Sequence, residues 1–343
     1  MTKPLLMNPT ALDAALEASF TSRSTVTEKQ IAAFDRFAKL RFPNRRVEGW
    51  KWSDFNGALR GFAPANDGAH ATTIAPSPFA ALAPLEIRIV DGRIELPPGD
   101  LPEGVRYGIM DTVGTIAELE NHSMAALNVA MTRKAFGLEV MEGVDFKQPI
   151  IVRHINTGRA FSFAQTMMRF APNARAHLIE TYEGDGAGFY SHLCHLAVRD
   201  GATVTRTVLN EASAQQILNA ICAVKVDGDA TFNQTSFSTG GKLVRHESHV
   251  HFWAPNSSAN INSAALLSDD RHCDFTSETV HFANPVFSVF QVWGHLFRPD
   301  LCICRVHRSL LQIFPDRCTY QLRPARPVYM VHQNSGDSAC HLS

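Results

Sequence analysis

The sequence predicts a mainly β protein that begins with a helical region, and the spacing of its turns carries this prediction. Turn dipeptides recur at Pro172-Asn173, Asp200-Gly201, Asp227-Gly228 and Pro255-Asn256, which places them 27–28 residues apart. Alternating runs such as Ala202–Leu209 lie between them, with weaker breaks roughly midway. This period favours a solenoid of stacked β-coils. From the spacing alone, an antiparallel sandwich or barrel remains the alternative.

The residues before the repeating region predict helices and one hairpin. Residues 10–40 are helical in pattern, with Thr27 among the N-cap oxygens for the run Glu28–Leu40. Asp91-Gly92 is a strong hairpin signal between two short alternating runs. Residues 116–132 are rich in Ala and Met and also predict a helix.

Four segments follow from these patterns. We expect an N-terminal helical region (1–60), a linker and mixed α/β segment (61–137), a β-helix core (138–283) and an atypical tail (284–343).

The composition excludes several classes of protein. In 343 residues, 32 Lys and Arg face 33 Asp and Glu, which argues against a broad nucleic-acid-binding surface. The N-terminus lacks the pattern of a signal peptide, and the longest mainly apolar stretch, Val286–Phe297, is too short to cross a bilayer. Seven cysteines do not make a disulfide scaffold. We therefore expect a cytoplasmic protein with neither nucleic acid nor membrane as a partner.

Several segments together resemble one family. Arg41–Phe55 (RFPNRRVEGWKWSDF) carries a Pro, Arg, Glu, Trp, aromatic and Asp in order. Ala125–Gly143, followed by Pro149-Ile150, and later Arg245-His246-Glu247 and Ala264–Ser268 continue the pattern. In order and spacing these residues resemble the SufB/SufD family of iron–sulfur cluster assembly proteins, and its SufD branch more closely, over roughly residues 10–283.

The resemblance implies both a fold and a function. The fold would be a right-handed parallel β-helix (β-solenoid) preceded by an N-terminal α-helical region. The function would be that of a non-catalytic scaffold subunit in a SufBCD-type complex, with a SufB-like subunit and a SufC-like ATPase as partners. We expect no cofactor bound stably by this chain alone, and a nascent iron–sulfur cluster or iron only within the complex.

The tail departs from that family. Residues 284–343 contain no Lys and no Glu, but six Arg, five Pro and four of the seven Cys. The family's further coils, its Cys/His segment and its C-terminal helical domain have no match after Ala283. We interpret the tail as out-of-frame translation, with a genuine divergent tail as the alternative. No cluster-forming residue is carried over.

A short run of polar residues is the main candidate for metal binding. If residues 247–251 form a strand, Glu247, His249 and His251 share one face, because side chains alternate. Imidazole and carboxylate groups are plausible metal ligands, although no third ligand from elsewhere in the chain is identifiable. The alternative function is therefore a metal-dependent β-barrel (cupin-like) enzyme that uses His249 and His251. A polar strand face without metal is the simpler interpretation.

Other candidates favour structural roles. Cys194 and Cys273 have histidine neighbours, yet free cysteines are usually small buried apolar residues. Trp50 and Trp52 could stack on a nucleotide or flavin, but packing of the helical region onto the first β-coil is favoured. Cys302-Ile303-Cys304 with His307 looks like a metal clip and is discounted because it lies in the tail.

Overall fold

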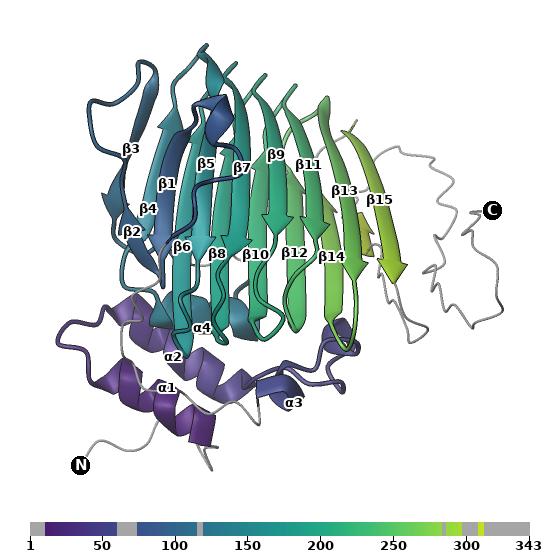
Figure 1. Cartoon of the computed structure of the whole chain (residues 1–343). Helices are drawn as coiled ribbons and strands as arrows, with labels where there is room; N and C mark the ends of the chain where they lie inside the picture. Colours follow the sequence, from purple (N-terminus) through teal and green to yellow (C-terminus); the bar gives the residue numbers. More distant parts are fainter. Residues whose placement is uncertain (1–10, 60–73, 115–118, 283–285, 297–307, 312–343) are drawn as a thin grey trace.

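The computed structural model describes residues 11–59, 74–114, 119–282, 286–296 and 308–311, the last two ranges by their backbone alone. Two eight-stranded sheets form two layers, with the helices gathered at one end of the strands (Figure 1). Sheet A has the order β15-β13-β11-β9-β7-β5-β1-β2, and sheet B has the order β16-β14-β12-β10-β8-β6-β4-β3.

The helices are α1 (Ala11–Thr21), α2 (Glu28–Leu40), α3 (Phe55–Leu59) and α4 (Ser123–Met131), with short 3-10 turns at Glu48–Trp50 and Ala80–Leu82. The strands are β1 (Leu85–Val90), β2 (Arg93–Glu95), β3 (Val105–Met110), β4 (Ala135–Val140), β5 (Asp145–Ile155), β6 (Phe161–Phe170), β7 (Arg175–Glu183), β8 (Phe189–Val198), β9 (Thr203–Asn210), β10 (Ile217–Val226), β11 (Thr231–Ser238), β12 (Leu243–Phe252), β13 (Ser257–Leu267), β14 (His272–His281), β15 (Val286–Leu296) and β16 (Arg308–Leu311).

Successive strands from β5 onward alternate between the two sheets, so each pair of strands makes one coil. In sheet A, Arg175 aligns with Thr203, Thr203 with Thr231, and Thr231 with Ser258, all in parallel pairs. These steps reproduce the 27–28-residue period of the sequence. The protein is therefore a parallel β-solenoid of about five turns. It is not the antiparallel sandwich or barrel that the spacing left open, because neighbouring coils pair in parallel.

The turn dipeptides stack on one another. The backbone N–H of Asn173 donates to the carbonyl oxygen of Asp200, and that of Gly201 donates to Gly228. Asn173 (φ 60°), Gly201 (φ 67°) and Asn256 (φ 61°) adopt left-handed conformations, which Asn and Gly tolerate best. Asp91-Gly92 joins the antiparallel strands β1 and β2, as predicted.

The N-terminal helices cover the outer face of sheet B over the first halves of its strands. Thr27 caps α2 in a capping box with Gln30, and α2 packs against α4. Strand β12 is buried at all ten positions, whereas β9 in sheet A alternates between half-buried and buried. The difference arises because the N-terminal region lies on the outer face of β12, where Trp50 contacts Arg245. On the outer face of sheet A, the segment 74–84 with its 3-10 turn contacts β5, where Arg153 donates to the carbonyl oxygen of Ala75.

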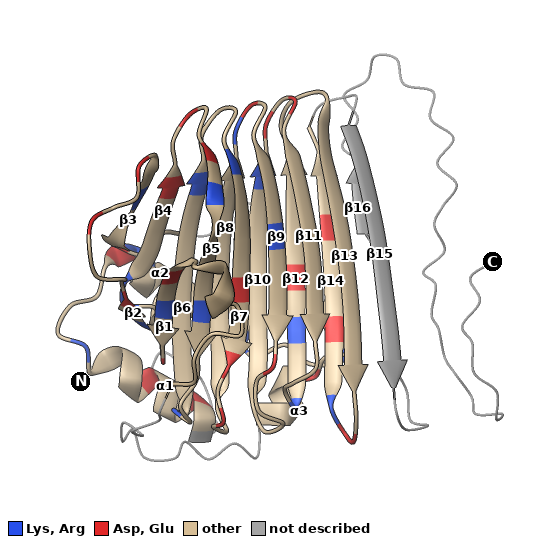
Figure 2. Ribbon diagram, turned by 45° about the horizontal axis from the view of Figure 1, so that its top comes forward, with Lys and Arg blue, Asp and Glu red and all other residues tan. Residues whose placement is uncertain are grey.

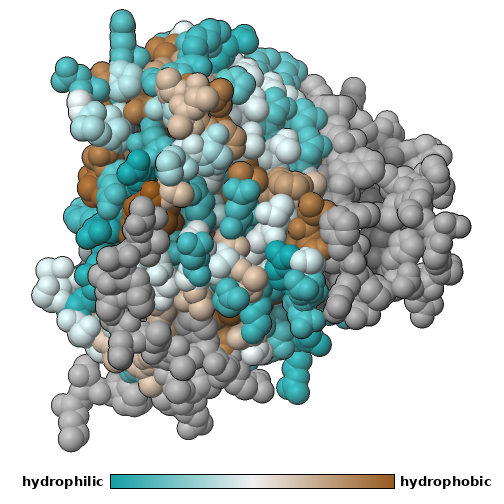
Figure 3. Space-filling view, in the orientation of Figure 1, coloured by the Kyte–Doolittle hydropathy of each residue, from teal (hydrophilic) through white to brown (hydrophobic). Residues whose placement is uncertain are grey.

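The outer side of sheet A is mixed in polarity. Figure 3 shows hydrophilic residues interspersed with apolar ones over the described part of this face, without one continuous apolar surface. In the part of the chain that the structure describes, no helix has the length and apolar character needed to span a membrane.

Candidate functional site

A cluster of buried ionisable side chains lies where the helical region meets β12 and β14. Val244 and Phe252 face the solenoid core, so the odd-numbered residues of β12 face outward, toward the helices. Arg245, Glu247 and His249 follow one another on that outer face. Figure 2 shows the acidic and basic positions of β12 and β14 next to each other.

Arg245 is the central cation of this cluster. Its guanidinium lies 4.0 Å from the centre of the Trp50 ring and is almost completely buried. Its Nε donates to Glu247 Oε1 at 2.8 Å, and its Nη1 donates to Asp274. Burial opposes the charge, but these two carboxylates raise the pKa of Arg245. Ser53 Oγ donates to Asp274 at 2.5 Å, which ties the N-terminal region to the same ion pair.

The other oxygen of Glu247 faces two imidazoles. Glu247 Oε2 lies 3.1 Å from His122 Nε2 and 3.3 Å from His249 Nε2. His122 is the N-cap residue of α4, where its Nδ1 accepts the backbone N–H of Ala125 at 3.2 Å. The helix cap thus positions the His122 ring above β12.

The electrostatics of the cluster favour charged forms. Burial penalises the Glu247 carboxylate, but Arg245 and His122 hold its pKa well below the usual range. Burial also opposes the His249 cation, yet hydrogen bonds to Glu247 and Glu278 raise the pKa of His249 to about 9. His249 Nδ1 lies 3.5 Å from Glu278 Oε2.

His122, Glu247 and His249 together could hold a metal ion, because one ligand atom from each lies within 4.8 Å of the others. The predicted trio of Glu247, His249 and His251 is only partly brought together. His122 is the residue that sequence reasoning missed. It lies 125 positions before Glu247, and its only local signal is a place just before an apolar helix.

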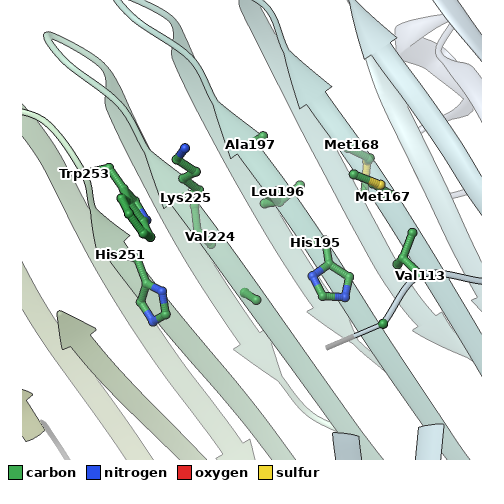
Figure 4. Close-up of a pocket in the computed structure, with 12 residues that line it drawn as sticks. Val113, Met167, Met168, His195, Leu196, Ala197, Val224, Lys225, His251 and Trp253 are labelled. Carbon is green, nitrogen blue, oxygen red and sulfur yellow. The ribbon is translucent and has the colours of Figure 1, made fainter. Parts of the chain in front are cut away.

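His251 instead lines a pocket further along the same face (Figure 4). This pocket holds about 460 Å³ and is walled largely by apolar groups, among them Met167 and Trp253. Lys225 lies over the Trp253 ring at 5.0 Å, and His195 comes from β8. Burial lowers the pKa of His195 to about 4, so its ring is neutral at physiological pH.

A second polar cluster lies inside the solenoid. Arg206 donates to Glu180 Oε2 at 2.5 Å and to Gln234 Oε1 at 2.6 Å. His192 lies 2.8 Å from the Tyr182 hydroxyl, and His154 Nε2 lies 3.7 Å from Glu180 Oε1. His154, Glu180 and His192 also have metal-ligand spacing. All three are enclosed among the coils, so an ion would reach them only if the coils opened.

The remaining candidates take structural positions or lie outside the described residues. Cys194 and Cys273 are buried, as expected for core residues. Trp50 packs against Phe55 and Arg245, so it contacts β12 in a late coil and not the first one. The segment Cys302-Ile303-Cys304 with His307, and most of the tail, lie outside the described residues.

Comparison with known proteins agrees with this fold. Residues 153–288, from β5 into β15, match the model of the SufBD core domain of the SUF system for iron–sulfur cluster assembly. The protein is thus a β-solenoid whose coils from β5 into β15 are similar to the SufBD core domain.

One curated protein that is similar to this chain is a SufD protein. Over 278 residues the chain is 24% identical to the iron–sulfur cluster assembly protein SufD of Escherichia coli (strain K12), covering 75% of this chain and 63% of that relative. The chain therefore spans less than two thirds of the relative's length. The resemblance seen in the sequence is confirmed, and the chain is SufD-like.

Proposed function

We propose that this chain is a non-catalytic scaffold subunit in iron–sulfur cluster assembly, acting with a SufB-like subunit and a SufC-like ATPase. In this proposal a nascent cluster, or iron, is the cargo of the complex and is held only within it. The observation that supports it most is that the SufBD core match coincides with the stacked coils from β5 into β15.

The physical properties of the solenoid suit a scaffold. A stack of coils in continuous parallel register forms a stiff body, and from β9 to β13 the outward positions of sheet A are half-buried or exposed. Such a long open flank can contact a partner over many coils. The cupin-like alternative has lost its structural basis, because the described strands form two open sheets and His251 lines a pocket apart from His249.

The proposal can be tested by the cluster content of the complex. SufB-like and SufC-like proteins from the same organism are expressed with and without the full chain, and iron and acid-labile sulfide are measured per SufB-like subunit. We expect a severalfold higher content when the chain is present. Equal content in the two preparations would contradict the scaffold role.

A further inference from the structure

We propose that His122, Glu247 and His249 bind one divalent transition-metal ion, through His122 Nε2, Glu247 Oε2 and His249 Nε2. This inference goes beyond the scaffold role, because it assigns a single ion to the chain by itself. It also departs from the expectation that the chain alone binds no cofactor stably. Its success or failure is independent of whether the chain associates with partners.

The positions of the ligand atoms support the site. With metal–ligand bonds of about 2.0–2.2 Å, neighbouring ligand atoms lie roughly 3.0–3.5 Å apart. Glu247 Oε2 lies 3.1 Å from His122 Nε2 and 3.3 Å from His249 Nε2. These separations agree with two pairs of adjacent ligands around one ion. Only small side-chain movements are then needed to admit the ion.

The neighbouring groups orient these ligands. Arg245 occupies the other oxygen of Glu247 and so directs Oε2 toward the two imidazoles. Glu278 lies 3.5 Å from His249 Nδ1, on the side of the ring opposite the proposed ligand atom. A carboxylate behind a ligating imidazole is the usual arrangement in metal sites, because it fixes the tautomer and the ring orientation.

The formal charges also match a divalent cation. With both imidazoles neutral, the carboxylates of Glu247, Asp274 and Glu278 outnumber the guanidinium of Arg245 and leave a charge of −2. Bound inside a largely buried cluster, a divalent ion would balance this charge in full. The proton that His249 carries before the ion binds balances only half of it, and the ion displaces this proton from Nε2 to solvent.

The donor set indicates the class of metal. Two imidazoles and one carboxylate suit Fe²⁺, Mn²⁺, Co²⁺ or Zn²⁺, and not the oxygen-rich sites that Ca²⁺ and Mg²⁺ require. Three protein ligands leave at least one coordination position for water or another small ligand.

Binding has one structural consequence in α4. His122 accepts the Ala125 amide through Nδ1, so the ring proton lies on Nε2 and points to Glu247. For Nε2 to bind a metal, this proton must move to Nδ1, and the Ala125 N–H then loses its acceptor. We therefore expect the first turn of α4 to loosen when the ion binds.

The test uses Co²⁺ as the probe on the full chain after treatment with a chelator. Cys302 and Cys304 are replaced by Ser in every sample, because their thiolates could bind Co²⁺ separately. We expect one Co²⁺ per chain, with the visible absorption of nitrogen and oxygen ligation. Hydrogen exchange at the Ala125 amide should become faster when Co²⁺ is bound. Less than stoichiometric binding would overturn the proposal.

Two variants and one control locate the site. His122→Asn keeps an N-cap side chain but removes the imidazole ligand, and His249→Gln removes the second. Each should weaken Co²⁺ binding more than tenfold. His251→Gln changes another outward histidine of β12 and should leave the affinity unchanged. Wild-type affinity in His122→Asn, or an equal loss in His251→Gln, would contradict this assignment even if His249→Gln fails to fold.

Discussion

At the scale of single residues, Arg245 connects the N-terminal region to the solenoid. It lies against Trp50, donates to Glu247 within its own strand and pairs with Asp274 in the next coil. Buried charges of this kind are retained only when they are paired, because an unpaired buried charge is very unfavourable. Removing the Arg245 guanidinium would leave the buried carboxylates of Glu247 and Asp274 without their cationic partner.

The first prediction concerns this cation. Arg245→Ala should lower the free energy of unfolding by about 3–5 kcal/mol, because Glu247 and Asp274 lose their buried partner. Arg88→Ala is the control, since the Arg88 side chain is 46% exposed and pairs with Glu86 at the surface. The control should cost less than about 1 kcal/mol. Urea unfolding gives the free energy of unfolding of both variants. Similar losses of stability in the two would refute the role of Arg245.

The second prediction concerns the pH dependence of stability. An unfolded histidine titrates near 6.5, whereas burial lowers the pKa of His195 to about 4. Between these values the unfolded chain binds a proton that the folded chain does not, so the protein loses stability as the pH falls from about 6.5 to 4. Lys225 and His251 line the same pocket and do not offset this effect with negative charge.

His195→Gln should remove this contribution, which is at most about 3 kcal/mol. Unfolding free energies measured at pH 7, 5.5 and 4.5 should therefore fall less steeply in the variant than in the wild type. Parallel curves would show that His195 does not carry the effect.

At the scale of elements, the coil is the unit that the sequence specifies best. Asn and Gly at the turn positions and alternating runs between them predicted the period, because each is a local signal repeated in every coil. They favoured parallel stacking but left an antiparallel sandwich or barrel open. The candidate site was less predictable. Glu247 and His249 follow from strand alternation, but the position of His122 depends on how α4 packs on sheet B, which no local pattern encodes.

The third prediction concerns the close contact between turns. A Cβ atom at Gly240 would lie 2.1 Å from the carbonyl oxygen of Ala212, in the turn of the preceding coil. Gly240→Ala should therefore cost about 1–3 kcal/mol, because backbone atoms must move apart. Gly49→Ala is the control, since nothing lies within 4 Å of its Cβ position. Thermal melts compare the two, and an undiminished melting temperature in Gly240→Ala would contradict this contact.

At the scale of the whole molecule, the two sheets differ in what covers them. The N-terminal helices lie on the outer face of sheet B, while the outward positions of sheet A are half-buried or exposed from β9 to β13 (Figure 1). The order of the helical region and the solenoid was predictable from the sequence, because helical and strand periods differ. The sequence did not predict which sheet the helices cover, because both sheets have apolar positions on their outward faces. The proposed partner surface depends on this asymmetry.

The most direct test of the scaffold role is association with the proposed partners. The full chain is co-expressed with SufB-like and SufC-like proteins of the same organism, and the purified material is measured by native mass spectrometry. We expect one complex in which all three are present at fixed stoichiometry. If the SufB-like and SufC-like proteins assemble with each other while this chain remains alone, it is not a subunit of that scaffold.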